Sequence, residues 1–140
     1  MTGAQLEGHC LCGNVTYQGS GEPIATALCH CEDCQRQTGS TFSIVVLVDR
    51  SQLNIEGDTL ATFKTVGTEG GAERERKFCS NCGSPIVTFL ADKPDLAIIK
   101  AGTLNDRSWL SPQLEVWCDS GQTWMDTSAE RGRFPTGLPA

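Results

Sequence analysis

The sequence has 140 residues, of which 39% are hydrophobic and 6% aromatic, and its formal net charge is −6. The acidic balance argues against a nucleic-acid partner, because nucleic-acid-binding modules carry a basic face. No stretch approaches the roughly 18–20 apolar residues of a membrane span, so we expect no membrane partner either. We expect one domain over residues 1–140. We expect it in the cytoplasm, because the beginning of the sequence has no apolar signal segment and because thiols stay reduced in that compartment.

Short strand-like segments bounded by glycine, proline and polar turns run along most of the sequence. In chain order, the expected strands are Asn14–Gln18, Ile24–Leu28, Phe42–Val48, Leu53–Glu56, Leu60–Thr65, Glu73–Phe78, Pro85–Leu90, Leu96–Ala101 and Leu114–Cys118. Only Glu32–Thr38 is typical of a helix, which Gly39 is placed to end. We expect a loop at 65–72 and an irregular tail at 128–140, with Phe134 and Leu138 as possible anchors. The pattern predicts a mainly β fold with one short helix.

Seven of the eight cysteines fall into two pairs and one triplet. The pairs are Cys10 with Cys12 and Cys79 with Cys82, and the triplet is Cys29, Cys31 and Cys34. Neither pair fills a tetrahedron, but together the pairs supply the four thiolates of a closed structural zinc site. The triplet leaves one coordination position open, as is typical of a catalytic zinc. The spacing therefore predicts two zinc ions per chain.

The triplet also indicates the kind of chemistry. Three thiolates on Zn²⁺ leave a formal charge of −1, so the ion would be a poor Lewis acid but a good partner for a soft, incoming thiol. We therefore expect a site for a small thiol rather than a hydrolytic site. The alternative is a purely structural second site, closed by His30 or Cys118. We expect His30 to point away from its cysteine neighbours into a supporting or surface role, and Cys118 to be a small buried residue.

Several other residues have both a functional and a purely structural interpretation. Arg36, Arg76 and Lys77 are candidates to hold a substrate carboxylate, although charge runs usually form a solvated face. The three tryptophans fit packing better than a ligand cage, but Trp117 or Trp124 near the open zinc position is an alternative.

Three stretches resemble the glutathione-dependent formaldehyde-activating enzyme family, which includes centromere protein V. They are Gly8–Tyr17, Cys29–Phe42 and Phe78–Ser84, and the order and spacing of all seven clustered cysteines match. The segment from Pro112 to Trp124 is similar to the family's ending, with Glu115 where a histidine is often seen. The resemblance implies coiled β-hairpins around two zincs, one structural on the cysteine pairs and one catalytic on the triplet.

The same resemblance implies an activity. It would be the condensation of glutathione with formaldehyde to S-hydroxymethylglutathione, named for its reverse direction as a carbon–sulfur lyase. We therefore expect a zinc-dependent enzyme that acts on a thiol–aldehyde adduct, with a small thiol and an aldehyde as partners. The alternatives are a non-catalytic zinc-binding module for protein interaction or small-thiol binding, and a redox sensor that uses the same cysteines.

Overall fold

The computed structural model describes residues 6–66, 71–125 and 130–138, and it is mainly β with one α-helix in these ranges. The strands are β1 (Glu7–His9), β2 (Thr16–Gly19), β3 (Ala25–Cys29), β4 (Ser43–Asp49), β5 (Leu53–Glu56), β6 (Leu60–Val66), β7 (Glu73–Cys79), β8 (Pro85–Leu90), β9 (Lys93–Lys100), β10 (Leu114–Val116) and β11 (Gly132–Arg133). The helix α1 is Glu32–Thr38, and single 3₁₀ turns lie at Arg50–Gln52, Ala101–Thr103 and Cys118–Ser120.

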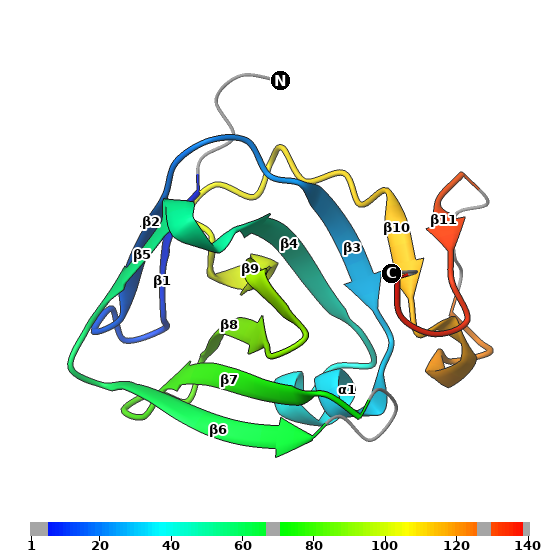
Figure 1. The fold of residues 1–140 in the computed structure, drawn as a ribbon, viewed down its shortest axis with the longest axis horizontal. Coiled ribbons are helices and arrows are strands. Elements are labelled where there is room, and N and C mark those ends of the chain that lie inside the picture. The colour runs from blue at the N-terminus through cyan, green and yellow to red at the C-terminus, as the bar shows by residue number, and fades with distance from the viewer. Residues whose placement is uncertain (1–5, 67–70, 126–129, 139–140) are drawn as a thin grey trace.

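The strands form two sheets (Figure 1). The smaller sheet has the order β1-β2-β5, and the larger has the order β11-β10-β3-β4-β9-β8-β7-β6. Strand β10 is parallel to both β3 and β11, whereas the other pairs are antiparallel. Figure 1 shows the larger sheet strongly curled, with α1 close to the ends of β3 and β7.

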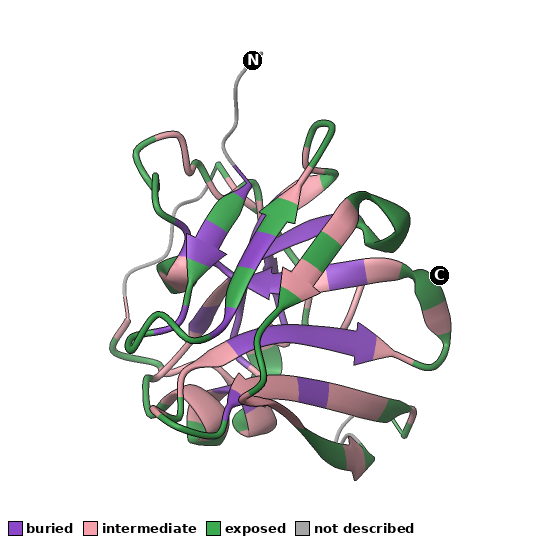
Figure 2. Cartoon of the chain, turned by 90° about the vertical axis from the view of Figure 1, so that its left-hand side faces the viewer, coloured by how far each residue is buried: buried purple, intermediate pink, exposed green. Residues whose placement is uncertain are grey.

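Strand β4 explains where the core lies, because it buries both of its faces (Figure 2 shows the buried stretches in purple). On one face, Val46 and Val48 join the main core, which also contains Tyr17 of the smaller sheet and Val15, the residue before β2. On the other face, Val45 and Leu47 pack with Ala27 and partly buried side chains from β9 and the tail. Successive strand residues point to opposite faces, so a continuous apolar run such as that of β4 serves two cores.

The structure confirms the mainly β prediction and corrects some boundaries. Strands β5 and β8 and helix α1 have the predicted bounds, and Gly39 ends α1 with a positive φ of 68°. The predicted strand Leu114–Cys118 ends early at Val116, because Trp117 has a left-handed φ of 57°. Strands β1 and β11, of three and two residues, have too few alternating residues to be predicted.

The loop and the tail lie partly outside the described ranges. Residues 67–70 of the expected loop and residues 126–129 and 139–140 at the C-terminal end are not described. The rest of the tail is not fully irregular, because it forms β11 beside β10. The tail anchors are confirmed, since Phe134 and Leu138 both pack against the core cluster that contains Val116.

Candidate metal centre and active site

Two tight turns bring four sulfur atoms together. These atoms belong to Cys10, Cys12, Cys79 and Cys82, and they all lie within 4.8 Å of one another. The Sγ of Cys12 is 3.6 Å from that of Cys10 and 3.8 Å from that of Cys79. A tetrahedral zinc with Zn–S bonds of 2.3 Å needs sulfurs about 3.8 Å apart, so this cluster has the size that zinc requires.

The backbone of each turn is shaped by a glycine that follows the second cysteine. Gly13 and Gly83 both have φ of 84°, a conformation that only glycine adopts without strain. The amide N–H of Gly13 donates to the carbonyl of Cys10, and that of Gly83 donates to the carbonyl of Cys79. The two turns therefore have the same backbone arrangement.

Polar neighbours favour the ionised form of two of these four thiols. The Ser84 hydroxyl lies 3.3 Å from the Sγ of Cys82 and lowers its pKa to about 5. The Thr59 hydroxyl lies 3.2 Å from the Sγ of Cys79 and lowers the pKa of that thiol. Because metals bind thiolates rather than thiols, these hydrogen bonds prepare the cluster for a cation.

The cysteine triplet lies where β3 ends and α1 begins. Cys29 is the last residue of β3, Cys31 caps the helix, and Cys34 is in its first turn. The three Sγ atoms lie within 4.8 Å of one another, with 3.5 Å between Cys29 and Cys34. The backbone N–H of Cys34 donates to the Sγ of Cys31 at 3.2 Å. The spacing again fits sulfurs that share one zinc ion.

Without a metal ion, the three thiols share their protons unequally. Hydrogen bonds from Cys29 and Cys31 lower the pKa of Cys34 to about 2, and the positive charges of Lys100 and Arg76 act in the same direction. The pKa of Cys29 is strongly raised by its hydrogen bonds to the other two sulfurs and by burial. The three sulfurs therefore share protons through hydrogen bonds, and Cys34 is the ionised one. A cation can take the place of the shared protons.

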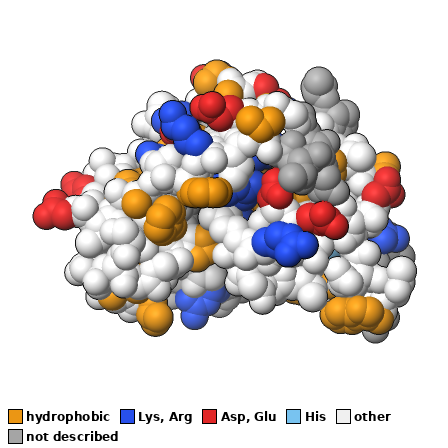
Figure 3. Space-filling model, turned by 90° about the horizontal axis from the view of Figure 1, so that it is seen from below, with side chains coloured by type: hydrophobic (Ala, Val, Ile, Leu, Met, Phe, Trp, Pro, Cys, Tyr) orange, Lys and Arg blue, Asp and Glu red, His pale blue; other side chains and the backbone are white. Residues whose placement is uncertain are grey.

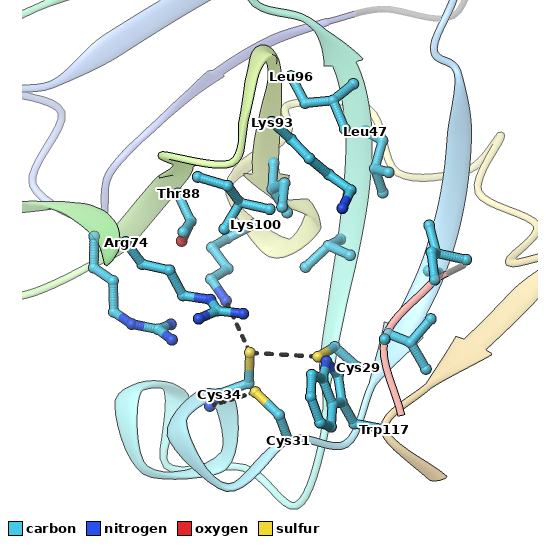
Figure 4. Close-up of a pocket in the computed structure, with 18 of the residues that line it drawn as sticks. Cys29, Cys31, Cys34, Leu47, Arg74, Thr88, Lys93, Leu96, Lys100 and Trp117 are labelled. Atoms are coloured by element: carbon cyan, nitrogen blue, oxygen red, sulfur yellow. Dashed lines mark hydrogen bonds between the residues drawn. The ribbon is translucent and has the colours of Figure 1, made fainter. Parts of the chain in front are cut away.

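A cavity of about 260 Å³ opens beside the triplet (Figure 4). All three cysteines line it, as does Trp117, which confirms that this tryptophan lies near the cluster. The ammonium of Lys100, on β9, lies 3.9 Å from the Sγ of Cys34 and 3.2 Å from the hydroxyl of Ser43. The triplet is thus accessible from the cavity, whereas the other cluster already has four sulfurs, the full set of ligands of a tetrahedral zinc.

The other residues that the sequence suggested are dispersed. Of the three cations proposed to hold a carboxylate, only Arg76 lines this cavity. Arg36 lines a separate cavity, and Lys77 donates to the Thr62 hydroxyl at 2.6 Å. Trp124 is 70% exposed and does not line the cavity.

His30 and Cys118 do not join the three sulfurs within the 4.8 Å spacing; they form a separate group with Glu115. A surface role for His30 is wrong, because it is buried and its Nε2 lies 2.9 Å from a carboxylate oxygen of Glu115. Burial of Cys118 is also wrong, since it is half-buried at the start of a 3₁₀ turn. The side chain of His30 does point away from the cavity, as the extended backbone predicted.

The burial of two polar residues, Glu115 and Lys100, was not predicted from the sequence. Glu115 has no exposed surface and also lies 3.7 Å from Arg131, so it ties β10 to the segment that carries the triplet. Lys100 is 5% exposed. A single lysine at the end of an otherwise apolar run, Leu96–Ile99, was the one available signal for it.

Two cysteine clusters of metal-binding geometry on a mainly β framework define a cysteine-rich protein with one closed and one accessible candidate metal site. The chain belongs to the glutathione-dependent formaldehyde-activating enzyme family, whose model matches residues 5–120. The matched range contains all seven clustered cysteines.

Two individual proteins resemble the chain over nearly its full length. A Halomonas elongata protein, provisionally named as a glutathione-dependent formaldehyde-activating enzyme, is 26% identical over 139 residues, which cover 96% of this chain and 88% of that protein. The crystal structure of a Rhodobacter sphaeroides protein superposes with a TM-score of 0.58 at 18% identity, covering 92% of this chain and 99% of that one. The likeness to the Rhodobacter sphaeroides structure concerns the fold alone. In the described part of the chain, no helix is long and apolar enough to cross a membrane.

Proposed function

We propose that this protein is a zinc-dependent carbon–sulfur lyase that acts on a thiol–aldehyde adduct such as S-hydroxymethylglutathione. The observation that carries the proposal is the contrast between the two cysteine clusters. One cluster has four sulfurs, a full tetrahedral set, while the three sulfurs of Cys29, Cys31 and Cys34 line a cavity. The first arrangement is typical of a structural zinc and the second of a zinc that keeps a position for substrate.

The proposed reaction joins a thiol to a carbonyl carbon. One carbon–sulfur bond forms, the carbonyl π bond becomes a C–O single bond, and the thiol proton ends on the new hydroxyl, so no other reactant is consumed. A zinc ion on the triplet would hold the substrate sulfur in its thiolate form. The cavity walls would bring the two reactants together and exclude water, which is the main contribution that binding makes to such a condensation.

Lys100 supports this chemistry from within the cavity. Its ammonium lies beside the Sγ of Cys34 and lines the cavity. When a substrate thiolate held next to Cys34 attacks a carbonyl carbon, the negative charge that develops on the carbonyl oxygen would lie near this ammonium. A buried cation stabilises such charge strongly, because few water molecules screen it. Three thiolates, one divalent cation and Lys100 sum to −3 + 2 + 1 = 0, so Lys100 also balances the charge of the metal site.

Two matched variants test the proposed function. Cys31→Ser removes one triplet ligand, whereas Cys118→Ser changes the one cysteine outside both clusters. Exchange between formaldehyde plus glutathione and S-hydroxymethylglutathione is followed by NMR with the zinc-loaded protein. We expect the wild type and Cys118→Ser to accelerate the exchange, and Cys31→Ser to return it to the uncatalysed rate.

Circular dichroism and zinc content control for loss of the fold, since Cys31→Ser should retain the zinc of the four-sulfur cluster. Full activity in a folded Cys31→Ser protein would refute the proposed role of the triplet. Thiol binding without any acceleration by the wild type would instead favour a non-catalytic thiol-binding module.

A further inference from the structure

Two chemical kinds of side chain line the cavity beside the triplet. The apolar ones are Ala27, Val45, Leu47, Leu96, Ile98 and Leu138. The charged ones are four cations, Arg74, Arg76, Lys93 and Lys100, together with one acid, Asp92. The whole chain has 11 Lys and Arg against 17 Asp and Glu, so the charge balance of the cavity is opposite to that of the molecule.

Two of the four cations already have partners near the sulfurs. Arg76 donates to Gln37 at 3.0 Å and lies 3.8 Å from a carboxylate oxygen of Asp33. Lys100 lies against Cys34 and Ser43. Both cations therefore belong to the charge balance of the triplet and its surroundings.

The other two cations, Arg74 and Lys93, are available. The guanidinium of Arg74 donates to the carbonyl of Ala72 at 3.1 Å and forms no ion pair with a carboxylate of the described residues. The side chain of Lys93 forms neither a hydrogen bond nor an ion pair with the described residues. Both side chains are half-buried, so a ligand anion would be held in partly desolvated surroundings where charged hydrogen bonds are strong.

The positions along the cavity give the order of chemical groups in a ligand. Figure 4 shows Lys93 with Leu47 and Leu96 at one end of the cavity and the three cysteines at the other. A ligand whose sulfur reaches the triplet would pass apolar side chains before its far end met Lys93. The volume of about 260 Å³ lies just below the 300–1,000 Å³ of usual ligand sites, which indicates a compact ligand.

We infer that the thiol substrate is a compact mercaptoalkanoic acid, with its sulfur at the triplet, its hydrocarbon stem on the apolar side chains and its carboxylate at Lys93, while Arg74 adds positive charge to the cavity. The inference rests on the proposed function, because it takes the triplet as the site of the thiol. It makes the two cations determinants of specificity, and it ranks a short carboxylate thiol above a bulky, polar tripeptide such as glutathione.

The test compares thiols by their binding to the cobalt-substituted protein, in which the thiolate-to-cobalt absorption reports on the triplet. The probes are 6-mercaptohexanoate, the neutral 6-mercaptohexan-1-ol, and glutathione. We expect 6-mercaptohexanoate to bind at least about 10-fold more tightly than the other two, since one charged hydrogen bond contributes about that much. In Arg74→Gln/Lys93→Gln, the advantage of the carboxylate over the alcohol should disappear, while the affinity for the alcohol stays the same.

Lys77→Gln is the matched control, because it removes a positive charge from the same strand, β7, outside this cavity. If the double variant does not fold, Lys93→Gln alone replaces it. This single variant should lose part of the difference in affinity between the carboxylate and the alcohol. Equal affinities for the carboxylate and the alcohol, or tighter binding of glutathione, would overturn the inference and leave the proposed function standing. A cobalt spectrum that no thiol changes would overturn both.

Discussion

At the scale of single residues, the site is governed by the contact between Lys100 and Cys34. A lysine that is 5% exposed is costly to bury unless an anion accompanies it. The Cys34 thiol, whose pKa its cysteine neighbours lower to about 2, supplies that anion at 3.9 Å. The charge of Lys100 therefore favours the thiolate form of Cys34, and a metal ion on the triplet would enter a site that already contains a thiolate.

Tyr17 permits a prediction about pH, because it is the one tyrosine in the chain. Burial raises its pKa to about 12, an effect that its hydrogen bond to the Thr103 hydroxyl, at 2.7 Å, opposes. The unfolded state would ionise this phenol near pH 10 and the folded state near pH 12. The folded state thus holds more protons between these values, so stability should fall by about 1.4 kcal/mol per pH unit as the pH rises across this window.

Absorbance at 295 nm measures the ionisation directly, with far-UV circular dichroism as the control for folding. We expect Tyr17 to remain largely protonated at pH 10.5 while the β signal is intact. Half-ionisation near pH 10 in the folded protein would contradict the buried position of this side chain.

At the scale of elements, the short strand β1 depends on a close approach at Gly8. A Cβ added there would collide with the Tyr17 ring and with the Thr103 carbonyl. Gly8→Ala should therefore destabilise the protein by about 1–3 kcal/mol or more, as overpacking of a core does. Urea unfolding of the metal-loaded protein measures the change.

Gly102→Ala is the matched control, because a Cβ at Gly102 has no neighbour within 4 Å. We expect this variant to unfold at nearly the same urea concentration as the wild type. Equal stability of the two alanine variants would show that β1 does not pack against β2 as closely as described.

Local features of the fold could be predicted from the sequence because their causes are local. The cysteine spacing, the positive φ of Gly83 and the end of α1 at Gly39 each depend on a few neighbouring residues. Strand β5 alternates apolar and polar residues, and β8 is rich in β-branched residues; clear turns bound both strands. Strands β1 and β11 lack such a signal, because pairing with other parts of the chain defines them.

The composition of the cavity could not be predicted, because it depends on the register of distant strands. Arg74 on β7 lines the same cavity as Lys93 and Lys100 only because of the β7–β8 and β8–β9 pairings, which include two register shifts. Similarly, His30 and Glu115 are 85 residues apart and meet because β10 pairs in parallel with β3. A sequence pattern indicates which residues form a strand, but not which distant side chains that strand will contact.

At the scale of the whole molecule, the two clusters hold together parts of the chain that lie far apart in sequence. The four-sulfur cluster joins residues 10–12 to residues 79–82, and Leu11 adds a backbone hydrogen bond to the Ser84 hydroxyl at 3.0 Å. A metal ion there would fix a long loop, which contributes directly to folding. The triplet lies apart, on β3 and α1, where its exposed side faces a cavity rather than another turn.

Cobalt substitution tests the central claim, one closed and one accessible metal site, most directly. We predict two cobalt ions per chain, of which Cys12→Ser and Cys31→Ser each remove a different one. Addition of 6-mercaptohexanoate or glutathione should change the absorption of the ion that Cys31→Ser removes and leave the other unchanged. Two ions whose absorption no thiol alters, or a single ion per chain, would contradict the account.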